Sequence, residues 1–220
     1  MGQKVNPVNF RIGVSNTWKS RWFAERGEYR KFLFEDILLR RSLEEKLKLA
    51  GVCSVDIERL PKAMTIRLLV SRPGIVIGRG GSGIEDVKKF VVEKLGFTPK
   101  SPKLSKIEII VEEVKNSDLS ARLVAQRITG ELERRMPHRR VVTKIMERVM
   151  AAGAKGIRIS LAGRIGGADI ARSEKFQVGS VPTQSLRADI DYAQAQALLK
   201  KGYVGIKVWV YKGQEENHAA

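Results

Sequence analysis

Residues 75–84 read Ile-Val-Ile-Gly-Arg-Gly-Gly-Ser-Gly-Ile, a glycine loop between an apolar run and an amphipathic segment. Glycines permit a tight turn, and the N-terminus of a following helix presents backbone N–H groups that favour phosphate. The chain of 220 residues carries a formal net charge of +17, and such a charge favours a polyanionic partner because neutralised phosphates release counterions. The loop and the charge together predict that the bound phosphates belong to a nucleic acid.

The residues around the loop predict its structural context from their periodicity. The expected elements are a helix over 29–50, adjacent antiparallel strands over 52–60 and 64–70, a helical turn from Pro73, a helix over 84–95 and a strand over 106–114. In this order the loop joins two helices.

The stretch Gly78–Gly83 also satisfies the G-x-G-x-x-G pattern of dinucleotide-binding folds. That pattern requires a strand leading directly into the first glycine, but Pro73–Gly74 interrupts it. It also requires a carboxylate about twenty residues further on, where the chain has Lys100 and Lys103. A P-loop fails as well, because no Gly-Lys-Ser or Gly-Lys-Thr follows. We therefore expect no nucleotide cofactor.

Gly78, Arg79, Gly80 and Gly81 instead fit the G-x-x-G loop of a KH module, which clamps a nucleic-acid backbone between two helices. Arg79 adds a charge at the predicted tip, and the order of elements matches the type II KH arrangement. A tight turn without a ligand remains the alternative.

The second half of the chain predicts two helices on a small, mainly antiparallel sheet. The helices are expected over 119–136 and from Pro137 to Met150, with Ser117 or Asp118 as a cap, and the strands over 157–162, 170–178, 187–192 and 204–211. The whole chain is thus of the α+β class.

Basic side chains gather where these two helices meet: Arg134, Arg135, Arg139, Arg140 and Lys144. No acidic residue lies between Glu133 and Glu147. Arg140, Lys144 and Arg148 recur every fourth residue, and like charges at that spacing repel each other. The pattern favours contact with RNA phosphates, with an ordinary solvated helix as the alternative.

A second glycine cluster, Gly163, Gly166 and Gly167, permits a close-approach backbone beside Arg164 and Arg172, which we expect to bind phosphate. A hairpin turn without a ligand is the alternative.

Catalytic and metal-binding chemistry is not expected. Asp189 and Asp191 share one face of a predicted strand, but no nucleophile or histidine completes a site, so we expect them to pair with arginine. His138 and His218 lie far apart in the chain, and Cys53 is its only cysteine. The absence of a disulfide partner indicates a reducing compartment, which we expect to be the cytoplasm.

We expect four segments: an N-terminal arm over 1–24, a KH domain with its preceding helix over 25–116, a C-terminal domain over 117–212 and a flexible tail over 213–220. In the arm, Trp22 and Phe23 either stack on bases or anchor the arm to the body. The sequence contains neither a run of eighteen apolar residues nor an apolar leader, so we expect no membrane partner.

Several blocks of the sequence resemble bacterial small-subunit ribosomal protein three, in order along nearly the whole chain. These blocks are Met1–Pro7, Phe10–Gly13, Pro73–Gly78, Leu161–Arg172, Leu186–Ala193 and Gly205–Gly213. The resemblance implies a type II KH domain and a family-specific C-terminal domain, bound as a monomer to ribosomal RNA in the head of the small subunit.

The resemblance also implies a position at the channel through which messenger RNA enters, beside ribosomal proteins four and five, with ten and fourteen as neighbours in the head. Family members use basic residues of one helix to help unwind messenger RNA, and Arg139 and Arg140 match that arginine pair. The family's next lysine falls on Thr143, whereas this chain has Lys144 one position later. A rotation of about 100° separates the two positions on a helix.

The residues, taken without the family resemblance, leave two other functional classes to consider. A separate KH regulator would carry repeated KH modules or a nuclease domain, and neither is apparent. A nucleotide-dependent enzyme is disfavoured by the context of the glycine loop.

Overall fold

The computed structural model describes residues 4–61, 63–95 and 106–214. The chain divides into a central unit, Trp18–Lys115, and a terminal unit made of Met1–Thr17 and Asn116–Ala220. Residues 215–220 of the predicted tail, with His218, and the positions of Lys100 and Lys103 lie outside the described residues.

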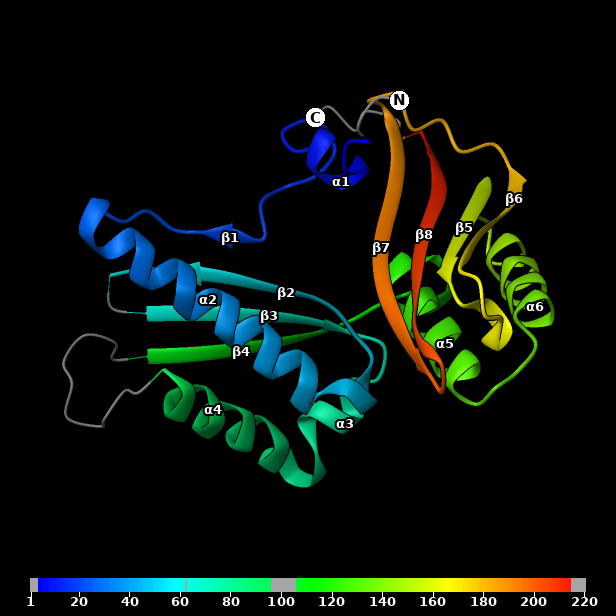
Figure 1. Cartoon of the computed structure of the whole chain (residues 1–220). Coiled ribbons are helices and arrows are strands. Elements are labelled where there is room, and N and C mark those ends of the chain that lie inside the picture. Colours follow the sequence, from blue (N-terminus) through cyan, green and yellow to red (C-terminus); the bar gives the residue numbers. More distant parts are fainter. Residues whose placement is uncertain (1–3, 62, 96–105, 215–220) are drawn as a thin grey trace. The chain divides into compact units, whose positions relative to one another are not determined.

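The central unit has the element order that the sequence predicts for a type II KH domain (Figure 1). Its elements are β1 Ser20–Arg21, α2 Arg26–Lys46, η1 Lys48–Ala50, β2 Val52–Arg59, β3 Ala63–Val70, α3 Pro73–Ile77, η2 Arg79–Gly81, α4 Ser82–Lys94 and β4 Lys106–Glu113. The sheet order is β1-β2-β3-β4, in which β2 and β3 pair antiparallel and the outer pairs are parallel. The predicted helix-strand-strand-helix-helix-strand order is confirmed.

Burial in the central unit follows the period of each element. Leu39 and Leu43 of α2 are one turn apart and fully buried, as are Val87 and Val91 of α4. They pack in one core with alternate residues of the strands, such as Ile66. The helices α2 and α4 therefore cover the same face of the sheet. The short helix α3 comes shortly before α4 in the chain.

Trp22 anchors the segment before α2 to the central unit. Its indole Nε1 donates to Asp36 Oδ2 at 2.8 Å, and its ring lies 5.3 Å from that of Tyr29. Asp36 is fully buried and also accepts from Arg59 Nε at 2.9 Å. The anchoring interpretation holds for Trp22, whereas Phe23 is 90% exposed.

The terminal unit has two long helices and a four-stranded sheet. Its elements are α1 Pro7–Phe10, η3 Ser117–Leu119, α5 Ala121–Glu133, α6 His138–Ala151, β5 Gly156–Gly163, η4 Ile165–Gly167, β6 Arg172–Gly179, β7 Ala188–Leu199 and β8 Gly202–Gln214. The strands pair antiparallel in the order β6-β5-β8-β7. Two helices on an antiparallel sheet are the predicted architecture.

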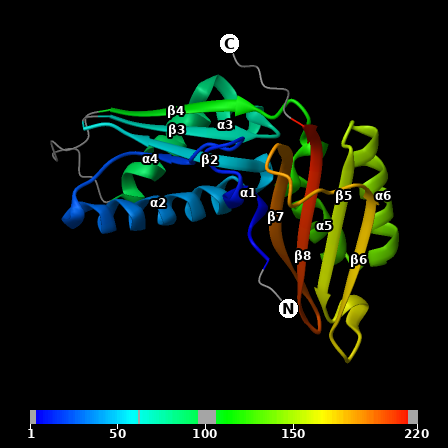
Figure 2. The same cartoon turned by 90° about the horizontal axis from the view of Figure 1, so that it is seen from above.

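The helices α5 and α6 pack on one face of this sheet (Figure 2). Ile128 of α5 and Ile145 and Val149 of α6 bury against Ile159 of β5 and Val208 of β8. The buried stripe of α6 follows the 3.6-residue period, as predicted.

Several elements differ from the prediction, among them β1 in the arm and β8, which runs to Gln214 and so includes residues 213–214 of the predicted tail. The strand β7 continues to Leu199, because residues 193–199 pair with β8 although their alternating Ala and Gln have low strand propensity. Within the segment predicted as an N-terminal arm, α1 begins at Pro7 and Asn6 Oδ1 accepts from Val8 N at 3.0 Å. Asn6 and Pro7 therefore act as a helix cap and first helical residue.

Arg11 fastens this first segment to the rest of the terminal unit. Its side chain is fully buried and donates to the carbonyl oxygens of Ala188 at 2.7 Å, Ser185 at 2.7 Å and Pro7 at 2.9 Å. Burial lowers the pKa of the guanidinium, which Asp189 counteracts. The guanidinium donors of Arg11 are thus taken up by main-chain carbonyls, so this arginine is not presented to a phosphate.

Candidate nucleic-acid interface

The glycine loop of the central unit lies at the junction of α3 and α4, and its glycines are required for two different reasons. Gly80 and Gly81 have φ of 63° and 84°, in the left-handed region that favours glycine, and no atom lies within 4 Å of an added Cβ at either. Arg79 and Gly80 are exposed. The open space beside these peptides leaves their backbone accessible to a ligand.

Close packing dictates the other two glycines. A Cβ at Gly83 would lie 2.4 Å from the carbonyl oxygen of Val76, and one at Gly78 would lie 2.8 Å from Gly83 N. The loop therefore holds the end of α3 directly against the first turn of α4, whose N–H groups carry the positive end of the helix dipole. Ile75 and Ile77 beside it are 48% and 39% exposed. The surface offers backbone donors, one cation and apolar contact area, the combination with which a KH loop binds a nucleic-acid strand.

The turn between α5 and α6 places an arginine where glycine is usual. Arg135 N donates to Leu132 O at 2.9 Å and Met136 N donates to Glu131 O at 3.2 Å, which is the hydrogen-bond pattern of a Schellman cap. Arg135 has φ of 61° and is the one residue other than glycine with positive φ in the described chain. The left-handed conformation costs an L-residue about 1–2 kcal/mol. The cation is therefore held at this turn against its conformational preference.

The exposed face of α6 is basic. Arg139, Arg140 and Lys144 are exposed above a stripe of buried apolar residues on the opposite side of the helix. None of the three has an ion-pair partner among the residues that the structure describes. At about 100° per residue, Thr143 lies on the Arg139 side of the face, whereas Lys144 lies on the far side of Arg140.

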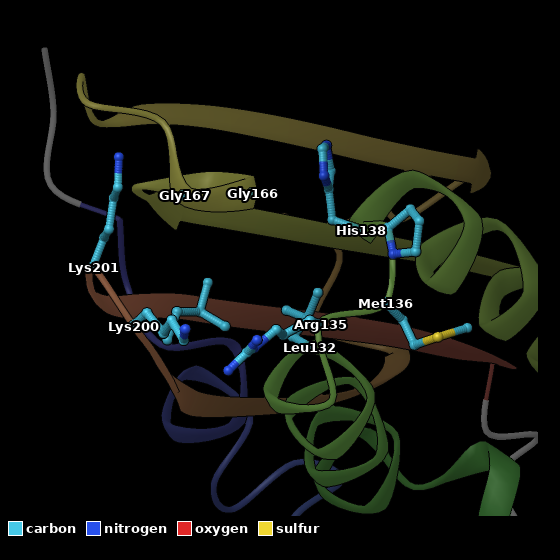
Figure 3. A pocket seen from close by; sticks show the side chains of 10 residues that line it. Leu132, Arg135, Met136, His138, Gly166, Gly167, Lys200 and Lys201 are labelled. Carbon is cyan, nitrogen blue, oxygen red and sulfur yellow. The ribbon is translucent and has the colours of Figure 1, made fainter.

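A pocket of about 450 Å³ lies beside the Arg135 turn (Figure 3). It is lined by residues of the α5–α6 turn, of η4 and of the β7–β8 turn: Leu132, Arg135, Met136, Pro137, His138, Gly166, Gly167, Leu199, Lys200 and Lys201. In Figure 3 the side chain of Arg135 points toward the β7–β8 turn that carries Lys200. The pocket combines an apolar wall with three permanent cations, which suits an anionic ligand that has an apolar part.

One carboxylate, that of Glu174, contacts both Arg172 and His138. Glu174 Oε1 accepts from Arg172 Nε at 2.8 Å, and Glu174 Oε2 lies 3.0 Å from His138 Nε2 at the start of α6. Desolvation acts to raise the pKa of Glu174, but the His138 hydrogen bond and the charges of His138, Arg172 and Arg139 lower it overall. Glu174 thus neutralises part of the Arg172 charge, so Arg172 presents less net positive charge than Arg140 does.

Arg164 lies next to the pocket. Its Nη1 is 3.5 Å from the carbonyl oxygen of Lys201, and a Cβ at Gly163 would lie 2.7 Å from Tyr203 O. Gly166 has φ of 66° with open space around it. The structure thereby brings the second glycine cluster to the same pocket as Arg135.

Comparison with known proteins gives two matches that follow these units. Residues 38–119 match the family model described as KH domain, and residues 128–210 match the one described as Ribosomal protein S3, C-terminal domain. The chain is 46% identical over 215 residues to the small ribosomal subunit protein uS3 of Persephonella marina, which covers 98% of this chain and 92% of that protein. It is 44% identical over 214 residues to uS3 of Shouchella clausii, covering 97% and 94%. The chain belongs to the uS3 family. This confirms the resemblance to small-subunit ribosomal protein three, and these two relatives are named as ribosomal proteins rather than enzymes.

The two uS3 domains each hold some of the predicted site residues. Gly78, Arg79, Gly80 and Gly81 lie in the region matched as KH domain, and the remaining predicted site residues, from Arg134 to Arg172, lie in the region matched as the S3 C-terminal domain. Their roles in RNA contact stay predictions. Sequence reasoning missed Lys200 and Lys201, although Gly202, which follows them between two strands, is a turn signal.

The predicted pairing with arginine is wrong for Asp191, whereas Asp189 forms an ion pair with a lysine and its charge also acts on the guanidinium of Arg11. Asp189 Oδ2 lies 3.9 Å from Lys212 Nζ, and Asp191 Oδ2 accepts from Ala121 N at 2.8 Å. Asp191 therefore caps α5, in place of the predicted Ser117 or Asp118. The pairing of β7 with β8 brings this carboxylate to the helix start across 70 residues of sequence, so no local signal could reveal it.

Residues 4–61, 63–95 and 106–214 hold neither a metal-binding cluster nor a membrane-spanning helix. No cluster of three or more His, Cys, Asp or Glu side chains in these ranges could hold a metal ion. No helix within them has the length and apolar character needed to cross a bilayer.

Proposed function

We propose that this uS3 family member is a structural, non-enzymatic RNA-binding protein of the small ribosomal subunit, where it binds ribosomal RNA in the head as a single copy. Its net charge of +17 and its exposed KH loop support this function. Its relatives are named as small ribosomal subunit proteins. Its partners there are ribosomal proteins ten and fourteen, and proteins four and five at the channel through which messenger RNA enters, in the cytoplasm.

The exposed α6 face carries the more specific part of the proposal, contact with incoming messenger RNA. Arg139 and Arg140 sit on a helix whose opposite side is locked in the core by Val142 and Ile145, so their position is fixed while their guanidinium groups face outward. With no ion-pair partner among the described residues, both retain a full charge for phosphates. Two rigidly placed cations can hold one strand of a hairpin as it opens.

Ribosomes that carry Arg139→Ala/Arg140→Ala test this role. Substitution at exposed helix positions changes stability by less than about 0.5 kcal/mol, so assembly is expected to be normal. We expect unchanged translation of an unstructured message and slower passage through a stable hairpin. Equal slowing on both messages would instead assign the pair to assembly or to general RNA affinity.

A matched pair of variants tests the register of the basic face. Lys144→Ala is expected to affect hairpin passage little, whereas Thr143→Lys/Lys144→Thr moves one charge to the Arg139 side at constant net charge. Faster hairpin passage by the exchange variant is the expected result. Co-sedimentation with small subunits in moderate salt separates this function from that of a KH regulator that acts off the ribosome.

A further inference from the structure

The sheet of the terminal unit has a second face that α5 and α6 do not cover (Figure 2). Ile157, Ile159 and Leu161 of β5 point toward the helices. Since successive side chains of a strand alternate, the residues between them point to the opposite face, which we call the outer face. Its two central cross-strand rows are formed by alternate residues of all four strands.

The first row combines an aromatic pair with a guanidinium. Gln177, Arg158, Trp209 and Tyr192 lie opposite one another across the four strands. The rings of Trp209 and Tyr192 have centroids 5.1 Å apart with their planes tilted by 38°, and both residues are half-buried. Arg158 Nε donates to Gln177 Oε1 at 2.9 Å, which leaves the outer guanidinium nitrogens available. The row therefore offers a π surface next to a cation.

The second row adds two exposed lysines. Lys175, Ser160, Lys207 and Gln194 pair across the same four strands, and both lysines and Gln194 are exposed. Adjacent rows are about 7 Å apart, because two residues of a strand span that length. The cations of the second row therefore flank the aromatic pair on one side.

Carboxylates are absent from both rows. The four strands contain three acidic residues, Glu174, Asp189 and Asp191, and each contacts a group away from the outer face: His138, Lys212 and the N-terminus of α5. At one end of this face Val181, Ile190 and Tyr211 form an apolar cluster, against which Trp209 of the first row packs. The two rows thus carry three cations, no anion and two adjacent rings.

We propose that the outer face binds a single-stranded segment of RNA, with bases stacked on Trp209 and Tyr192 and phosphates held by Lys175, Lys207 and Arg158. Aromatic rings on a sheet stack bases regardless of sequence, and flanking cations follow the phosphates. A protein partner fits less well, because the two rows offer no exposed aliphatic side chain. The proposal rests on the RNA-binding function proposed above and adds a second contact surface to it.

The experiment uses the full chain labelled with 5-fluorotryptophan, whose ¹⁹F spectrum reports Trp18, Trp22 and Trp209 separately. Loss of one resonance in Trp209→Phe assigns the signal of interest. The probes are an octamer of single-stranded RNA and an abasic octamer with the same number of phosphates. We expect the Trp209 resonance to shift with the RNA and to shift much less with the abasic octamer, since only bases can stack.

Charge is tested by Lys175→Ala/Lys207→Ala, with Lys31→Ala/Lys48→Ala on α2 and η1 of the central unit as the control that removes the same charge. Each single-strand phosphate contact contributes about 0.7 to the slope of log affinity against log salt concentration. Over the tenfold range from 1 M to 0.1 M salt, one such contact therefore raises the affinity about fivefold. The first variant is thus expected to weaken the Trp209 titration about 25-fold and the control to leave it unchanged.

An unmoved Trp209 resonance in a chain that still binds the RNA would overturn the outer-face site while leaving the proposed function intact. Equal shifts with both octamers, or equal weakening by both lysine pairs, would overturn stacking and phosphate contact at this face. Absence of all RNA binding would overturn this proposal and the proposed function together.

Discussion

Replacement of Gly83 by Ala tests whether the KH loop is built on close packing of α3 against α4. The new Cβ would lie 2.4 Å from Val76 O and 3.0 Å from Ile77 O, so α3 must withdraw by at least about 0.6 Å to reach an allowed contact. Both obstacles are backbone atoms next to the buried Val76 side chain, so they cannot turn aside. Overpacking of this kind costs about 1–3 kcal/mol, and the gain in helix propensity offsets at most about 1 kcal/mol. We expect a net loss of about 1–2 kcal/mol from the central unit.

Gly130→Ala in α5 is the matched control, because its added Cβ meets no atom within 4 Å. It is expected to stabilise the terminal unit by up to about 1 kcal/mol through helix propensity alone. Amide hydrogen exchange separates the two units, since β3 reports one and α5 the other. Unchanged or slower exchange of β3 in Gly83→Ala would refute the reasoning.

Two further predictions concern single residues. In urea unfolding, Arg135→Gly is expected to keep or raise the stability of the terminal unit, by up to about 1 kcal/mol, because glycine adopts the left-handed conformation without strain; the variant is also expected to reduce the salt slope of RNA binding. Arg134→Gly, at φ −76°, is the control and is expected to lower the stability by about 0.5–1 kcal/mol. Equal effects of the two substitutions would contradict the cap assignment. Burial raises the pKa of Asp56, although the charges of Lys19, Arg40 and Arg21 act to lower it. The folded state therefore binds a proton at Asp56 more readily than the unfolded state does, and the stability that this proton contributes is lost as pH rises through the folded-state pKa. Asp56→Asn is therefore expected to be more stable than the parent at pH 7 and equal to it below pH 3.8, and a constant difference across that range would count against it.

The local patterns of the sequence predicted most of the framework. The apolar stripe of α6, the alternating strands β2 and β3, and the glycine loop all depend on neighbours within a few residues, so their periods could be identified. Asn6 and Pro7 also carried a local signal, for the cap of α1, but the same two residues are equally typical of a chain break.

The features that escaped prediction depend on distant pairing. Asp191 caps α5 only because β7 runs beside that helix start, and residues 193–199 form a strand only because β8 supplies partners. The same pairing gathers Arg158, Trp209 and Lys207 on one face, although Arg158 precedes Lys207 by 49 residues in the sequence. In the candidate site, the sequence indicated which basic residues and glycines to expect, but it did not indicate that Glu174 pairs with Arg172 and partly neutralises its charge.

The affinity of the full chain for single-stranded RNA, measured as a function of salt, tests the central claim most directly. The comparison is between the parent and Arg79→Asp/Gly80→Asp, because both positions are exposed and the side chain added at the second one enters open space, at a φ that aspartate tolerates better than most residues. We expect the fold to be kept with a stability lower by about 1 kcal/mol, because aspartate at position 80 must adopt φ of 63°. We also expect weaker binding and a salt slope that is shallower by about 0.7 for each lost phosphate contact. Identical affinity and slope for the two proteins, or a parent slope near zero, would contradict RNA binding through this loop.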